Sequence, residues 1–372
     1  MKRIKSIDIL RGLAIICMFL YHIQIWWINK NDLFMIHAFY STYAILGTTG
    51  FLFISGVSTM ISFRDRAQKI SKGYTFRVIR KEYLIRALLI LIIALLYNLF
   101  VALTIGEITD IWKWFILLTI AFSLFMAWPL LKTSKALRAL IAIIFFIFDK
   151  FLVIFLANFQ GQLNFFGILF YLLYNTLDQD PVVSFFSFFL VGTIIGDLIY
   201  ETHQIEDIGI KKNFLKKKIL IPCLIIGSIM IIISILIPIP DILRVEKAGF
   251  DTTVNYPIFM SRGTLSWMIF AMGIEIALIA LLFSIEEFEI IKVKKSYKFL
   301  FYFSYYSFTT YITHNLLFFI FLEVLNIYNI FFITIITVIL YGLLLKILFK
   351  KFGSIVSIKA NIGRISIHLA RK

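Results

Sequence analysis

The stretch that decides the fold is Ser6-Ile-Asp-Ile-Leu-Arg-Gly-Leu-Ala-Ile-Ile-Cys-Met-Phe-Leu-Tyr-His22, an apolar run that contains Arg11 and ends in His22. In an α-helix, eleven residues at ~100° each return to within about 20° of the start, so these two side chains share one face, roughly 16 Å apart along the axis. An ionisable side chain inside a membrane is costly and by default indicates a functional site. The stretch therefore predicts a transmembrane helix with a fixed cation near one surface and a titratable base near the other. Such a helix suits a reaction whose reagents lie on opposite sides of a bilayer.

The composition is that of an integral membrane protein. Of the 372 residues, 61% are hydrophobic, and the apolar stretches are spread evenly along the chain. We therefore predict an all-α polytopic helix bundle, with one membrane domain over residues 1–352 and a basic cytoplasmic tail over residues 353–372. The first apolar stretch follows basic residues and lacks a small-residue cleavage site, which favours a retained helix over a signal peptide. The two cysteines, Cys17 and Cys223, lie in apolar stretches and indicate neither a metal site nor a redox site.

Apolar stretches near the ~20 residues that a helix needs to cross the hydrocarbon predict about ten spans. The predicted spans are 6–28, 39–63, 83–105, 111–131, 137–157, 182–200, 217–238, 264–285, 299–322 and 329–349. Residues 158–177 are harder to interpret, because their apolar run from Phe165 to Tyr174 is too short to span. We interpret this region as a re-entrant or interfacial helix.

The distribution of lysine and arginine predicts the orientation. These residues gather before the first span, after each even-numbered span and at the C-terminus, whereas the other loops hold few of them. Both termini are therefore expected to be cytoplasmic, in a multi-pass protein of the plasma membrane. The net charge of +16 is interpreted as a positive-inside signal and not as a nucleic-acid footprint. The predicted outer loop 239–263 suits a functional loop and a solvated connector equally well.

Three histidines are candidate bases. His22 lies in the outer half of the first span, His37 lies in the first outer loop or at the start of the second span, and His314 lies in the ninth span. A neutral imidazole takes a proton from a hydroxyl or an amine near pH 7. The structural alternative is a histidine that only bonds a neighbouring helix. Two acids inside predicted spans, Asp197 and Glu275, are candidates to orient a histidine, as a carboxylate does in a catalytic triad.

Four arginines could hold a phosphate through bidentate hydrogen bonds. Arg11 lies in the first span, Arg77 and Arg80 lie three residues apart before the third span, and Arg86 lies inside that span. A solvated positive loop explains Arg77 and Arg80 as well as a polyphosphate site does, but it explains Arg86 less well. In the second span, small residues that include Gly50, Ser55 and Gly56 favour close helix packing and would also let a thin ligand approach the backbone.

These residues resemble the transmembrane acyltransferase superfamily. Asp8, Arg11, Gly12, Ala14 and His22 fit the acyltransferase-3 pattern, in which ten residues separate the arginine from the histidine, and the stretches Phe76-x-x-x-Arg80 and Ser304 to His314 resemble later motifs of that branch. The stretches Phe51-Leu-Phe-Ile-Ser-Gly56-Val-Ser58 and Asp180-Pro181 to Gly196 resemble more closely the heparan-α-glucosaminide N-acetyltransferase branch.

The resemblance implies transfer of an acyl group, most typically acetyl, from cytoplasmic acetyl-CoA to a sugar or lipid-linked glycan at the outer face. It implies no metal cofactor. It implies that Arg11, Arg77, Arg80, Arg86 and Ser55 bind the donor. The first branch implies His22 as the catalytic base and the second implies His37. We favour His22, because the tryptophan and glycine that usually follow the second-branch histidine are replaced here by Ala38-Phe-Tyr-Ser41.

Two other classes of function remain open. A proton-coupled transporter of a small anionic or lipid-linked solute would also use cytoplasmic arginines and intramembrane histidines. The chain has no clear internal repeat with helices broken at matching positions, which such carriers often have. A non-catalytic scaffold would leave Arg11 and His22 unexplained. The sequence predicts no nucleic-acid partner, and it leaves a homo-oligomer, the identity of the acceptor and the choice between O- and N-acylation open.

Overall fold

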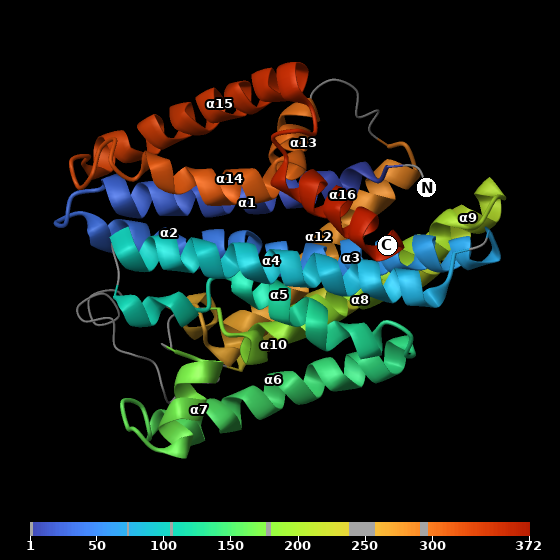
Figure 1. The fold of residues 1–372 in the computed structure, drawn as a ribbon, viewed down its shortest axis with the longest axis horizontal. Coiled ribbons are helices and arrows are strands. Elements are labelled where there is room, and N and C mark those ends of the chain that lie inside the picture. Colours follow the sequence, from blue (N-terminus) through green and yellow to red (C-terminus); the bar gives the residue numbers. More distant parts are fainter. Residues whose placement is uncertain (1–2, 73, 105–106, 176–179, 238–256, 291–296) are drawn as a thin grey trace. The chain divides into compact units, whose positions relative to one another are not determined.

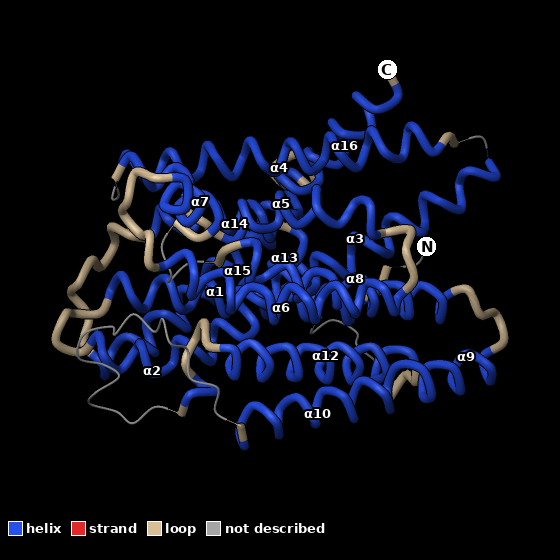
Figure 2. Tube along the Cα trace, turned by 90° about the horizontal axis from the view of Figure 1, so that it is seen from below, coloured by secondary structure: helices blue, strands red, loops and turns tan. Residues whose placement is uncertain are grey.

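The computed structural model describes residues 3–72, 74–104, 107–175, 180–237, 257–290 and 297–372. Within these ranges every regular element is a helix (Figure 2), apart from one isolated parallel bridge between Ile28 and Leu325. The all-α prediction is therefore confirmed. The chain divides into two compact units: unit 1 comprises residues 1–51, 212–239 and 246–361, and unit 2 comprises residues 52–211, 240–245 and 362–372. Most of the predicted outer loop 239–263 lies outside the described residues.

Helix α1 (Lys5–Trp27) is the centre of unit 1. Its packing partners are α2 (Leu33–Ala44), the π-helix Ile45–Gly50, α12 (Leu265–Glu287), α13 (Lys298–Tyr305), α14 (Ser307–Thr313) and α15 (Ile327–Phe352) (Figure 1). Helix α9 (Ile208–Leu215) and the π-helix Lys216–Leu220 lead into α10 (Ile221–Leu236), which packs along α12. Glycines let these last two backbones approach, since a Cβ at Gly273 would lie 2.8 Å from the carbonyl oxygen of Gly227.

Unit 2 is built around α8 (Val182–His203), most of whose residues are buried. The other helices are α3 (Phe51–Ala67), α4 (Phe76–Thr104), α5 (Ile116–Ala127), α6 (Lys135–Ala157) and α7 (Phe165–Leu173), with short 3-10 helices at Gln68–Lys72, Ile108–Trp112 and Trp128–Leu130. Helix α8 packs on α5 and α6, and α5 packs on α4. Glycines set the closest contact of α8 with α3: a Cβ at Gly56 would lie 2.0 Å from the Phe189 carbonyl oxygen, and a Cβ at Gly192 would lie 2.1 Å from that of Phe53. The close-packing interpretation of Gly56 is therefore confirmed.

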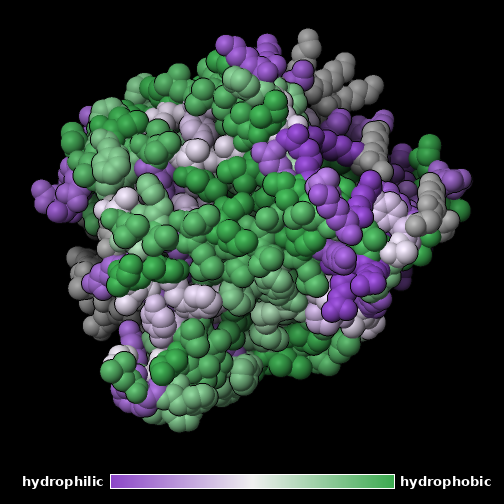
Figure 3. All heavy atoms as spheres, viewed as in Figure 1, coloured by the Kyte–Doolittle hydropathy of each residue, from purple (hydrophilic) through white to green (hydrophobic). Residues whose placement is uncertain are grey.

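Nine helical stretches within the described ranges are long and apolar enough to cross a membrane, and they correspond to nine of the ten predicted spans. They run over Lys5–Trp27, Thr42–Ile70, Phe76–Thr104, Ile108–Leu130, Lys135–Ala157, Val182–His203, Ile208–Leu236, Leu265–Glu287 and Ile327–Phe352. Apolar side chains cover much of the face shown in Figure 3, as helices that meet lipid require. The chain is thus a polytopic membrane protein.

The prediction of one continuous helix over residues 299–322 is wrong. The chain forms α13, breaks at Tyr306, forms α14, tightens into a 3-10 turn at His314–Leu317 and then runs through turns to Leu325. Tertiary hydrogen bonds accompany the break. The Tyr306 hydroxyl donates to the Gly353 carbonyl oxygen at 2.5 Å. The Thr309 hydroxyl likewise donates to the Val356 carbonyl oxygen at 3.0 Å. The segment contains neither proline nor glycine, so its sequence gives no sign of the break.

Two regions next to the spans form short helices. The short helix predicted within residues 158–177 is α7, whose nine residues pack against the end of α6. Asn164 begins α7 by accepting a hydrogen bond from the Gly167 backbone N–H at 2.8 Å. The predicted basic tail, 353–372, forms the amphipathic helix α16 (Ile358–Arg371), which buries Ile362, Ser366 and Ala370.

Candidate functional site

One face of α1 lies against the broken segment α13–α14 in unit 1, and Arg11 lies on this face. A glycine permits the approach, because a Cβ at Gly12 would lie 2.4 Å from the Leu300 carbonyl oxygen. Arg11 Nη1 donates to Ser304 Oγ at 3.2 Å and lies 3.5 Å from Asp8 Oδ1. Ser304 Oγ donates in turn to Asp8 Oδ1 at 2.9 Å. Arg11 is therefore buried within its own unit and does not snorkel to the membrane surface.

The N-terminal end of α1 carries further charges that neutralise one another. Asp8 also accepts hydrogen bonds from Arg3 and, at 2.7 Å, from the Tyr297 hydroxyl. Burial by itself lowers the pKa of the Arg3 guanidinium, but the hydrogen bond and charge of Asp8 outweigh it and raise that pKa. Glu286 of α12 accepts the backbone N–H groups of Lys5 and Ser6 at 2.8 and 2.7 Å. A carboxylate thus already satisfies the first unpaired donors of α1, where an anion would otherwise bind.

The other end of the same face holds two of the three candidate histidines together. His22 Nδ1 lies 2.6 Å from Nε2 of His314, although 292 residues separate them along the chain. Trp26 stacks on both rings, with centroid distances of 5.4 Å to His22 and 5.3 Å to His314. His314 is fully buried and His22 is partly exposed. The pair is therefore a polar contact among aromatic side chains, and His22 is the more exposed of the two histidines.

The chain that follows His314 is fastened to the end of α1. Trp27 Nε1 donates to the Leu317 carbonyl oxygen at 2.9 Å, and the Leu325 N–H donates to the Trp27 carbonyl oxygen at 2.8 Å. Beyond these contacts, Lys30 and Glu323 form an ion pair at 3.1 Å that is largely exposed. The histidine pair thus lies near the hydrogen-bonded C-terminal end of α1, beyond which the chain carries an exposed ion pair.

The remaining candidates lie elsewhere. His37 is in α2, and its side chain lies outside the described part of the structure. Glu275 of α12 is buried beside the π-helix, where its Oε1 would lie 3.7 Å from a Cβ at Gly50. Asp197, the other candidate acid, is bound by two arginines in place of a histidine.

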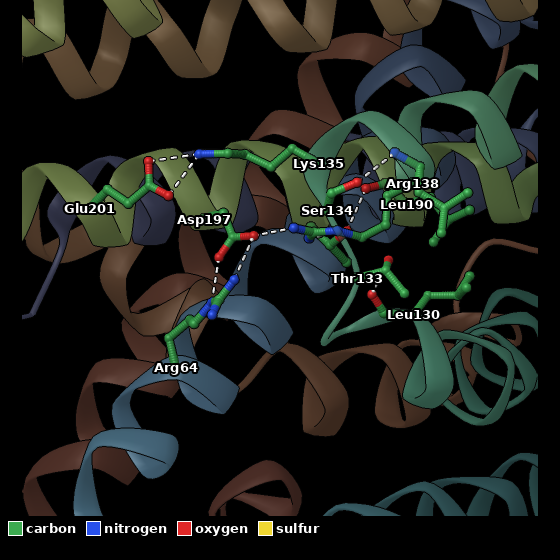
Figure 4. Close-up of polar contacts among 11 residues, drawn as sticks. Arg64, Leu130, Thr133, Ser134, Lys135, Arg138, Leu190, Asp197 and Glu201 are labelled. Carbon is green, nitrogen blue, oxygen red and sulfur yellow. Dashed lines mark hydrogen bonds and ion pairs between the residues drawn. The ribbon is translucent and has the colours of Figure 1, made fainter.

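Asp197 of α8 lies between Arg64 of α3 and Arg138 of α6 in unit 2 (Figure 4). Arg64 Nε donates to Asp197 Oδ1 at 2.7 Å, and Arg138 Nη2 donates to Oδ2. Arg138 has no exposed surface, and its Nη1 donates to the Thr193 hydroxyl at 3.0 Å. Its charge therefore belongs to a buried ion cluster that joins three helices, at the start of the predicted span 137–157.

Three of the predicted donor-binding arginines lie on α4 in unit 2. Arg77 and Arg80 are exposed on its first turns, where they share one helix face, and Arg86 is partly buried farther along. Nearby, Arg66 pairs with the buried Glu82 at 2.8 Å. Ser55 lies partly buried on α3 of the same unit, whereas Arg11 belongs to unit 1. Arg77 and Arg80 are thus the exposed pair among the predicted donor-binding residues.

Three features of the site were not predicted. Trp26 is one helical turn beyond His22, so its place beside that ring follows from the helical period. Asp8 and Arg11 are three residues apart, and this spacing indicates their pairing. Arg262, whose positive charge acts on His22, comes from the predicted outer loop 239–263. No sequence signal links it to the first helix.

Comparison with known proteins supports the resemblance. A model of the catalytic region of heparan-alpha-glucosaminide N-acetyltransferase matches residues 3–237. Searches of the curated proteins and of the solved structures gave no match. The matched range contains α1 with His22, and it contains both α3 and α8, whose glycines pack together. The chain therefore belongs to the heparan-alpha-glucosaminide N-acetyltransferase catalytic family, which makes it a membrane acetyltransferase.

Proposed function

We propose that this protein transfers an acetyl group from cytoplasmic acetyl-CoA to an amine or hydroxyl of a sugar or glycolipid at the outer face of the plasma membrane, with His22 as the general base. The family supports the reaction class and the donor. The single observation that carries the assignment of the base is the contact between His22 and His314 at 2.6 Å. A buried histidine that bonds a partly exposed one gives the latter a fixed orientation, as a general base requires.

The proposed step moves one proton and exchanges one bond. The acceptor gives its proton to His22 Nε2 while its nitrogen or oxygen bonds to the carbonyl carbon of the thioester. The carbon–sulfur bond then breaks, and the proton passes from His22 to the departing thiolate of coenzyme A. Arg262, whose charge acts on His22, is our candidate to stabilise the negative charge that develops on the carbonyl oxygen.

The proposed sidedness follows from the lysine and arginine pattern, which favours cytoplasmic termini. Helix α1 then begins on the cytoplasmic side, and its His22 end approaches the outer surface. The exposed ion pair of Lys30 with Glu323 just beyond this end supports contact with water there. For the donor, we propose that the exposed guanidinium groups of Arg77 and Arg80 hold the phosphates of coenzyme A from the cytoplasm.

The test is acetyl transfer by purified protein in lipid nanodiscs, with radiolabelled acetyl-CoA and a panel of glucosaminides and lipid-linked sugars. We expect product with the wild type and a loss of about 100-fold or more in His22→Ala, because general base catalysis contributes that much. His368→Ala, which changes an exposed histidine of α16, is the matched control and should keep full activity. Full activity in His22→Ala would exclude His22 as the base. Absence of transfer to every acceptor, in protein that acetyl-CoA does not stabilise, would count against the reaction itself.

A further inference from the structure

We infer that His314 is a positioning residue, which holds His22 in the one neutral tautomer whose Nε2 carries the lone pair. The inference rests on the proposed function for its catalytic consequence. Its structural content depends only on atoms of unit 1, namely the rings of His22, Trp26 and His314 and the backbone of Tyr311.

The other ring nitrogen of His314 fixes the tautomer of that residue. Its Nδ1 lies within hydrogen-bonding distance of the Tyr311 carbonyl oxygen. A carbonyl oxygen only accepts, so Nδ1 must carry the hydrogen. The carbonyl is available because α14 ends at Thr313 and the chain continues as a 3-10 turn, and the last carbonyls of an α-helix lack partners within the helix. The break in the predicted ninth span thus creates the acceptor that fixes the tautomer of His314.

The tautomer of His314 in turn determines that of His22. His314 is fully buried, and burial of an uncompensated charge is costly, so its ring is neutral. A neutral imidazole with hydrogen on Nδ1 has a lone pair on Nε2. His22 Nδ1, at 2.6 Å from that atom, must therefore be the donor. The hydrogen of neutral His22 then lies on Nδ1, and the lone pair lies on Nε2.

The orientation of the His22 ring is restrained as well. The rings of His22 and His314 are 17° from parallel, and Trp26 lies 29° and 21° from these two rings. Trp26 therefore limits rotation of both rings about their side-chain bonds. Within the described part of the chain, no hydrogen bond occupies His22 Nε2, the atom that this arrangement leaves as the base. The chain of contacts from Tyr311 through His314 to His22 thus does for His22 what a carboxylate does for the histidine of a catalytic triad.

The tautomer can be read without any activity assay. Protein labelled with nitrogen-15 histidine has five labelled side chains, and His22 is assigned by the signals lost in His22→Asn. Chemical shifts separate protonated from unprotonated ring nitrogens. We expect a protonated Nδ1 and an unprotonated Nε2 at His22 in the wild type. Hydrogen on Nε2 of His22 instead would overturn the inference.

Variants of His314 then test the consequence for catalysis. His314→Gln keeps an acceptor near the position of Nε2, whereas His314→Phe keeps the ring without any acceptor. We expect His314→Phe to mix the His22 tautomers and to lower kcat by about 10-fold to 100-fold with little change in KM, and His314→Gln to recover most of this loss. Thr313→Val is the matched control. Thr313 directly precedes His314, and the change removes its hydrogen bond with the Tyr341 hydroxyl but should leave kcat unchanged.

Three results separate the possibilities. Equal losses in the Phe and Gln variants, with an unchanged His22 tautomer, would assign His314 a packing role and refute the inference. An unchanged kcat in His314→Phe would refute it as well. The expected tautomer in a wild-type protein that transfers no acetyl group would uphold the hydrogen-bond chain and reject the proposed function.

Discussion

The buried ion cluster of unit 2 gives the sharpest prediction about stability. Asp197→Asn keeps the shape of the side chain but removes the carboxylate that Arg138 contacts. The Arg138 side chain has no exposed surface, so it cannot reach water. Breaking a buried ion pair in this way costs about 3–5 kcal/mol, because one charge stays buried without compensation. Arg64, with 38% of its side chain exposed, adds little to this cost.

A neighbouring ion pair provides the control. Glu201 is one turn beyond Asp197 on α8 and pairs with Lys135 at 2.7 Å, but 43% and 37% of these two side chains are exposed. Glu201→Gln should therefore cost less than about 1 kcal/mol. The double variant Asp197→Asn with Arg138→Met should recover most of the loss of Asp197→Asn, because no buried charge remains.

The free energy of unfolding of each variant can be measured in mixed SDS micelles, with tryptophan fluorescence as the signal. We expect Asp197→Asn to unfold at the lowest SDS fraction, and the double variant to unfold near Arg138→Met. If Asp197→Asn loses no more stability than Glu201→Gln, Arg138 is not a buried, uncompensated charge in that variant. The reasoning would then be refuted.

Two further predictions test packing and donor binding. Gly56→Ala places a Cβ against the Phe189 carbonyl oxygen and should lower the free energy of unfolding by about 1–3 kcal/mol or more. In the control Gly363→Ala, the new Cβ meets nothing within 4 Å, so the change should be nearly neutral. Thermal unfolding in detergent compares the two variants. Arg77→Ala with Arg80→Ala should reduce the rise in melting temperature that acetyl-CoA produces, since a tenfold weaker Kd removes about 1.4 kcal/mol of stabilisation at high ligand concentration. Lys217→Ala, an exposed cation of unit 1, should leave that rise unchanged, and an equal effect of both changes would exclude a specific phosphate site on α4.

The lengths of the apolar stretches predicted most of the spans. Unpaired backbone groups are costly in lipid, so an apolar stretch of about 20 residues crosses the membrane as a helix. These lengths predicted the ends of the spans less well. Helix α4 begins at Phe76, seven residues before the predicted span, and α9 begins at Ile208 instead of 217. Both extensions contain several charged residues. Such residues are excluded from hydrocarbon but form helical hydrogen bonds as readily as apolar residues do, so a helix continues past the membrane boundary that hydropathy detects.

The candidate site was predictable only along single helices. The helical period places Arg11 and His22 on one face of α1, and both side chains do contact the segment of residues 298–317. The identity of their partners depends on pairing between segments almost 300 residues apart, which no local pattern encodes. Arg138 shows the same limit, because its place at the start of the predicted span 137–157 does not reveal that its packing against α8 buries it.

The family match and the histidine pair together divide the chain by role. The stretches that carry the resemblance to the heparan branch form the α3–α8 contact of unit 2, where Gly56 and Gly192 lie against the backbone of the opposite helix. These glycines set helix packing. The matched range ends at residue 237, so it contains His22 but not His314. The partner that would fix the base thus comes from outside the matched range, and its role can be judged only from how the chain folds it onto α1.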